Sequence, residues 1–169
     1  MGEESLSAAV SFGERLASSQ AFTVLFREGM ALVEETATYL DGDGRQEAKV
    51  LQRHAALAYA TESMRLTTRL MQLASWLLLH RAVNEGEMSL MQARKEKAKV
   101  RVWSDERGDA ESRRVLPERL RELIDRSLEV QARVRRLDST IHSTNQAPAS
   151  NPVERQMGLL RAAFDSERA

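Results

Sequence analysis

The sequence predicts an all-α protein, on the basis of its composition, its prolines and the spacing of its apolar residues. Ala, Leu, Glu, Arg, Gln and Met, which favour helix, are abundant, and aromatic residues make up only 5% of the chain. All three prolines lie late, at positions 117, 148 and 152, so no proline interrupts the first hundred residues. Apolar residues recur at helical spacing over three long segments. We therefore expect a three-helix bundle with one very long central helix.

The first helix is expected to begin near Phe12 or Ser18 and to end at Leu40. Its apolar residues recur in three- and four-residue steps and form one stripe: Phe22, Leu25, Phe26, Met30, Val33, Ala37 and Leu40. The sequence YLDGDGRQ follows, in which Gly42 and Gly44 supply the backbone freedom of a tight turn. We expect this turn to separate the first two helices.

The second helix is expected to run from Gln46 to Asn84, with Gly86 as a C-terminal cap. Such a helix of about 39 residues would be roughly 60 Å long. It carries two apolar lines, one of Leu66, Leu70, Leu73 and Leu77 and the other of Met64, Met71, Ala74 and Leu78. These lines lie about 100° apart, so at least two neighbouring helices are needed to cover them. Because the helix is longer than a small monomeric bundle needs, we expect a homodimer.

Two less regular segments follow the central helix. Residues 89–103 begin like a short helix, and residues 104–114, SDERGDAESRR, are charged and lack an apolar anchor. We expect the latter segment to be a mobile linker.

The third helix is expected to begin at Pro117, a residue suited to a first helical turn, and to end near His142. Its apolar seam follows a coiled-coil spacing: Leu120, Leu123, Ser127, Val130, Val134, Leu137 and Ile141. Residues 1–142 are therefore predicted to form the helical domain. Residues 143–169 are predicted to be a disordered tail that carries a short amphipathic motif at 153–164.

Composition and charge exclude several classes of protein. The chain has 25 basic and 25 acidic residues and no cysteine, so it offers neither a strong electrostatic field nor a thiol site. The sequence MGEESL at the start lacks the basic and apolar regions of a secretory signal. The longest uncharged run of the second helix, residues 70–79, is half the roughly 20 residues of a spanning helix. We expect a cytoplasmic protein without membrane insertion.

No catalytic, cofactor-binding or metal-binding motif is found, so we do not expect an enzyme. The three histidines lack the spacing of a zinc protease, and no glycine-rich phosphate loop or nucleophile elbow is present. One alternative is a small helical enzyme that gathers Arg65, Arg69 and Glu62 around an anionic metabolite. Another is weak nucleic-acid binding through the basic sequence ARKEKAKVRVW. Glu96 interrupts that sequence and acidic residues follow it, so we expect no nucleic-acid partner.

One face of the second helix has the composition of a protein interface. Its residues are Glu62, Arg65, Arg69, Gln72 and Trp76, and a tryptophan beside arginines is typical of an interface hot spot. Packing of this face against residues 87–103 of the same chain, a dimer contact and contact with another partner all remain open. In the tail, the apolar side chains of the amphipathic motif either bind a partner or pack back onto the bundle. The candidate partner-binding residues are Arg65, Arg69, Gln72, Trp76, Met157, Leu159, Leu160 and Phe164.

Three stretches of the sequence resemble one known family. YLDGDGR, ALAYATESMRLTTRLMQLASWLLLHRAVNEGEMS and KEKAKVR are similar to the alphaproteobacterial regulator of CtrA degradation family, over roughly residues 12–103. The resemblance implies a dimeric, non-catalytic three-helix adaptor that helps the ATP-dependent protease ClpXP to degrade cell-cycle regulators. It also implies ClpX and ClpP, response-regulator-like and cyclic-di-GMP effector proteins and transcription-factor cargo as partners, and recruitment to the cell pole. It does not extend to residues 104–114 or to the tail.

Overall fold

The computed structural model of the chain describes residues 19–99 and 108–143, and every regular element in these ranges is a helix. The all-α fold class is therefore confirmed for this part of the chain. The helices are α2 (Gln20–Asp41), α3 (Asp43–Lys49), α4 (Arg53–Asn84), α5 (Leu90–Lys99), α6 (Ala110–Arg114) and α7 (Glu118–Ser143). The predicted tail beyond Ser143, including the motif at 153–164, lies outside the described residues.

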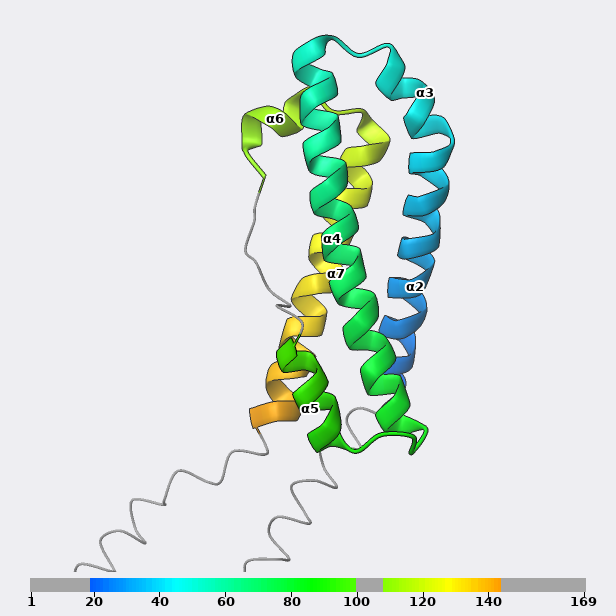
Figure 1. The fold of residues 1–169 in the computed structure, drawn as a ribbon, viewed down its shortest axis with the longest axis vertical. Helices are drawn as coiled ribbons and strands as arrows, with labels where there is room; N and C mark the ends of the chain where they lie inside the picture. The colour runs from blue at the N-terminus through cyan, green and yellow to red at the C-terminus, as the bar shows by residue number, and fades with distance from the viewer. Residues whose placement is uncertain (1–18, 100–107, 144–169) are drawn as a thin grey trace, which may run out of the picture.

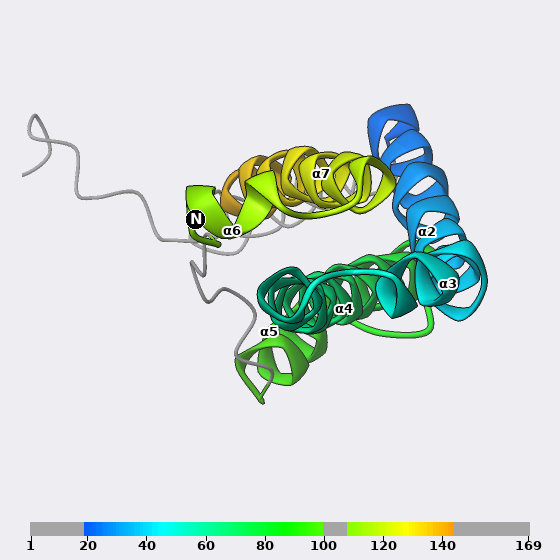
Figure 2. The same cartoon turned by 90° about the horizontal axis from the view of Figure 1, so that it is seen from above.

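The three long helices α2, α4 and α7 lie lengthwise against one another (Figure 1). The chain runs in one direction along α2 and in the opposite direction along α4 and α7, as the colours of Figure 1 show. Seen from above, the three helices are separate, and α5 lies beside α4 (Figure 2). Helix α6, which the sequence did not predict, contacts α4 and contributes no buried residue to the core.

The buried face of α2 differs in part from the predicted stripe. Its buried residues are Phe22, Leu25, Gly29, Leu32, Thr36 and Tyr39, which recur in alternating steps of three and four. Ala37, predicted to face the core, is exposed. The reason lies at Gly29, where a Cβ atom would be only 2.5 Å from Cδ1 of Leu77 on α4. Because Gly29 has no side chain, α4 can approach α2 closely at this position. The buried face of α2 is therefore centred on the side that carries Gly29.

The turn after α2 is shorter than predicted. Gly42 leaves the helical conformation, with φ −110° and ψ −109°, and its N–H donates to the carbonyls of Thr38 and Tyr39. Helix α3 begins at the next residue and folds back so that the Tyr39 hydroxyl donates to Glu47 at 2.7 Å. The predicted start of the second helix at Gln46 is therefore wrong, because residues 46–49 belong to α3.

The central helix α4 has 32 residues, and Gly86 follows it in the left-handed region at φ 73°. The predicted core line of Leu66, Leu70, Leu73 and Leu77 is confirmed, since all four side chains are buried. The second predicted line is wrong, because Met64 and Met71 are 71% and 66% exposed. α4 instead buries the face that carries Glu62, Arg69 and Trp76.

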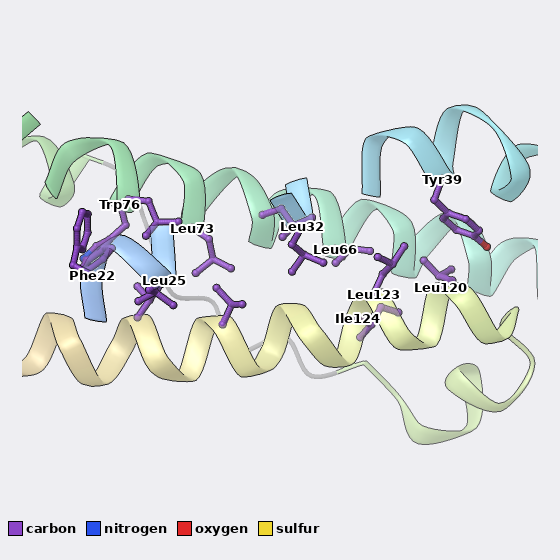
Figure 3. Packing of buried hydrophobic residues seen from close by; sticks show 14 of the residues in the cluster. Phe22, Leu25, Leu32, Tyr39, Leu66, Leu73, Trp76, Leu120, Leu123 and Ile124 are labelled. Atoms are coloured by element: carbon purple, nitrogen blue, oxygen red, sulfur yellow. The ribbon is translucent and has the colours of Figure 1, made fainter. Parts of the chain in front are cut away.

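Helix α7 packs as its spacing predicted. Leu120, Leu123, Ser127, Val130, Val134 and Ile141 are buried, and Leu137 packs against the same cluster. The core runs along the helices, with Phe22 and Trp76 at one end and Tyr39 at the other (Figure 3).

Exposed ion pairs join α7 to α2. Glu35 pairs with Arg119 and Arg126, and Glu28 pairs with Arg133. Partial burial would raise the pKa of Glu35, but the two arginines outweigh this effect and hold that pKa below its ordinary value. Such exposed pairs contribute little stability each, so the apolar seam holds α2 and α7 together.

Candidate functional site

Trp76, a candidate partner-binding residue on the predicted interface face, is 1% exposed and belongs to the core of its own chain. Its ring lies 6.1 Å from that of Phe22 and stacks on His80 at 4.0 Å between ring centroids. Its indole N–H donates to Oδ1 of Asp138 on α7 at 2.8 Å. Trp76 is therefore covered within its own chain, by an apolar contact from α2 and a hydrogen-bond acceptor from α7, and its ring is not presented to a partner.

Helix α5, which lies in the segment that one alternative placed over Trp76, reaches the same carboxylate. Lys97 of α5 pairs with the second oxygen of Asp138. Asp138 therefore links α4, α5 and α7 through one side chain. One member of the basic sequence considered for nucleic-acid binding thus makes an internal ion pair.

Arg69, a second predicted partner-binding residue, is also buried. Its guanidinium donates to the hydroxyl of Ser127 at 2.9 Å, and that hydroxyl donates to the carbonyl of Ile124. Burial lowers the pKa of Arg69, while the nearby Glu62 carboxylate opposes this shift. Glu62 is itself buried and accepts a hydrogen bond from Arg65 at 2.7 Å. Arg69 thus faces α7, and Glu62 is covered by Arg65 and the backbone at Gly108 rather than exposed.

The other predicted site residues have different positions. Arg65 and Gln72 are half-buried on α4, one position after Met64 and Met71 respectively. The tail residues Met157, Leu159, Leu160 and Phe164 lie outside the described residues, so their partner-binding role stays a prediction.

The exposed side of α4 presents an apolar surface that includes Met64, Met71 and Leu78, three residues predicted to face the core. Every seventh residue along it is a large apolar side chain, and we call this set the α4 stripe: Leu57, Met64, Met71 and Leu78, with 70%, 71%, 66% and 48% exposure. A helix with such a repeat is typical of a coiled-coil partner. The seven-residue spacing was visible in the sequence, but it was interpreted as part of one wide buried arc.

Small residues accompany the α4 stripe four positions later: Thr61, Thr68, Ser75 and Ala82. The hydroxyl of Thr61 donates to the carbonyl of Leu57, and that of Ser75 donates to the carbonyl of Met71. These donors are satisfied within α4, so a partner helix need not supply acceptors for them. The surface therefore suits close apolar packing against another helix.

The described residues show no group of three or more His, Asp or Glu side chains placed to hold a metal ion. None of the helices in the described ranges combines the length and the hydropathy that crossing a bilayer requires.

Comparison with known proteins places the chain in a family. Residues 13–164 match the family described as "Protein of unknown function (DUF1465)", so this match extends beyond residues 12–103 through residues 104–114 and into the tail. No curated protein matches the chain. The crystal structure of RcdA from Caulobacter crescentus CB15 is 50% identical in sequence, with a TM-score of 0.61, and the match covers 76% of this chain and 96% of that one. The chain therefore belongs to the DUF1465 family and to the family of RcdA, the regulator of CtrA degradation.

Proposed function

We propose that this chain is a non-catalytic adaptor that helps to deliver cell-cycle regulators to the ClpXP protease. The observation that carries the proposal is the 50% identity to RcdA over nearly the whole of that chain. The exposed apolar stripe on α4 supports it, because such a surface recognises helices rather than performing chemistry. Its partners would be ClpX and ClpP, a response-regulator-like accessory protein and transcription-factor cargo, in the cytoplasm or at the cell pole.

In this proposal, α2, α4 and α7 form a rigid three-helix bundle that pairs with a second copy through the α4 stripe. A two-fold axis across α4 would place Met64 and Met71 against the same surface of the other copy. The small residues beside the stripe would allow the helices to approach closely. Half-buried Arg65 and Gln72 would lie at the edge of this interface, where polar residues are usual.

The Met64→Glu/Met71→Glu double variant tests the dimer. The wild-type chain is expected to sediment as a dimer at micromolar concentration, and the variant as a monomer, because four carboxylates would be brought together at the interface. Both methionines are exposed, so the helical circular dichroism and the urea midpoint should change little. Analytical ultracentrifugation measures the mass.

The matched control is Val24→Glu/Val50→Glu, which places the same charges at exposed apolar positions away from the α4 stripe. This control is expected to remain dimeric. A monomeric wild-type chain, or a double methionine variant that remains dimeric, would contradict a dimer through α4.

Removal of residues 143–169 tests the adaptor function. The bundle should remain folded, since the described core ends at Ile141. The truncated chain is expected to lose the ability to stimulate degradation of CtrA by ClpXP with the accessory protein present, because the tail motif would no longer hold a second partner at high effective concentration. The initial rate of CtrA loss on a gel is the measurement.

A full-length variant with Met157, Leu159, Leu160 and Phe164 changed to serine separates the motif from tail length and should behave like the truncated chain. Unchanged degradation with both variants would refute the role of the tail. Absence of any stimulation by the wild-type chain would overturn the adaptor function itself.

A further inference from the structure

A groove of about 330 Å³ lies between the C-terminal half of α4 and helix α5, which are side by side (Figure 2). Its described lining consists of Ser75, Leu78, Leu79 and Ala82 of α4 and Glu96 of α5. Leu78 is 48% exposed, and the hydroxyl of Ser75 already donates to a carbonyl of its own helix. The α4 side of the groove therefore suits apolar side chains and asks for no hydrogen-bond partner.

The end of α7 lies at the same level of the bundle as this groove. Trp76 of α4 is hydrogen-bonded to Asp138 of α7, and the two helices run in the same direction (Figure 1). Ser143, the last residue of α7, is five positions after Asp138 and is therefore level with Arg81 of α4, near the groove residues. Asp138 also pairs with Lys97 of α5. The chain thus leaves α7 close to α5 and level with the groove.

The chain that follows α7 is long enough to reach the groove. Nine residues, 144–152, separate Ser143 from the tail motif at 153–164. Nine residues can span about 30 Å, whereas a helix with its side chains is roughly 10–12 Å wide. The motif can therefore pass around α5 and enter the groove without any change in the bundle.

The sequence of the tail motif is typical of a helix with one apolar side. Its apolar residues recur in steps of four, three and four: Val153, Met157, Leu160 and Phe164. Asn151, Pro152 and Glu154 are residue types favoured at the N-cap and at the first and third positions of a helix. Helices this short gain little stability alone, so such a motif needs a surface for its apolar side.

We propose that the tail motif binds as a helix in the groove between α4 and α5 of its own chain. A short tether gives an attached motif an effective concentration in the millimolar range. A second copy or another protein at micromolar concentration must bind the groove roughly a thousandfold more tightly to occupy it equally. The tether therefore favours the chain's own motif over any separate molecule.

The docking itself does not depend on the adaptor function, but its consequence rests on the proposed function. Ser75, Leu78 and Ala82 belong to the end of α4 that is proposed to face a second copy. The tail motif is proposed to hold a second partner. Docking would therefore withhold both surfaces until a partner competes for the motif.

Cross-linking of paired cysteines tests the docking, because the wild-type chain has no cysteine. Ala82→Cys/Ala163→Cys places one thiol in the groove and one in the tail motif. With a bismaleimide reagent at submicromolar protein, this full-length variant is expected to form a one-chain product. It should do so at least tenfold faster than the same variant with Met157, Leu159, Leu160 and Phe164 changed to serine. Gels separate one-chain from two-chain products, and mass spectrometry identifies the joined peptides.

The matched control is Ser139→Cys/Ala163→Cys, whose first thiol is exposed on α7 near the start of the same tether. The four serines should not slow cross-linking of this pair, because position 139 lies outside the groove. Equal rates at position 82 with and without the serines, or a mainly two-chain product, would overturn docking within one chain. Neither protease nor cargo is present, so failure of docking leaves the adaptor function standing, and the reverse also holds.

Discussion

The Trp76→Ala variant is expected to lose about 3–5 kcal/mol of unfolding free energy, the usual cost of truncating a buried tryptophan. The ring is 1% exposed and packs against Phe22 and His80, so its removal leaves a cavity at one end of the core. The variant also removes the N–H that donates to Asp138. Urea unfolding followed by circular dichroism measures the loss.

Two further variants separate the causes. Trp76→Phe keeps an aromatic ring but removes the N–H donor, and is expected to cost roughly 1–3 kcal/mol. Met71→Ala shortens an exposed side chain of the same helix and is expected to change stability by less than about 0.5 kcal/mol. A Trp76→Ala variant as stable as the wild-type chain would show that the ring is not buried, and would restore Trp76 as a candidate for partner binding.

Apolar spacing was enough to predict the seam of α7 and the leucine line of α4. In both cases one periodic set of large aliphatic residues faces the core, so local spacing alone determines which side is buried. The same reasoning failed for the rest of α4, which carries two seven-residue repeats. One repeat is the exposed α4 stripe, and the other, formed by Glu62, Arg69, Trp76 and Val83, is buried.

The sequence around α4 does not show that this repeat is buried, because the hydrogen-bond partners of its polar side chains lie far along the chain. Arg69 bonds to Ser127 and Trp76 to Asp138, which lie 58 and 62 positions further along the chain. Without these partners, a face with an arginine and a glutamate is expected to be solvated. Trp76 lies seven residues after Arg69 and fourteen after Glu62, so all three share one face of the helix. A tryptophan on that face was the available signal that another helix covers it.

The candidate partner-binding surface and a cavity beside Glu62 and Arg69 also show which features local sequence predicts and which depend on distant residues. Family resemblance indicated an adaptor function from the sequence, but it did not say which side chains are exposed. The sequence suggested Arg65, Arg69 and Glu62 as a site for an anionic metabolite. In the structure, Glu62 and Arg69 line a cavity between α4, α6 and α7. The other arginines of this cavity, Arg113 of α6 and Arg135 and Arg136 of α7, are brought beside α4 only by the fold.

The Gly29→Val variant is expected to lose about 3 kcal/mol of unfolding free energy, because α2 and α4 pack without room for a side chain there. A Cβ atom at this position would already lie 2.5 Å from Cδ1 of Leu77, and Leu77 is fully buried with Val130 nearby. Valine adds two further methyl groups, so the helices must separate or Leu77 must adopt a strained rotamer. Urea unfolding of the purified variant measures the loss.

A double variant tests whether the close approach to Leu77 is the cause. Leu77→Ala alone should cost about 2–5 kcal/mol by leaving a cavity. In Gly29→Val/Leu77→Ala the valine occupies part of that cavity, so the combined loss should be at least about 1 kcal/mol smaller than the sum of the two single losses. Ala37→Val makes a comparable change at an exposed position of α2 and should cost about 0.5 kcal/mol through helix propensity alone. Strictly additive losses at positions 29 and 77, or an equally large loss at position 37, would contradict this packing of α2 on α4.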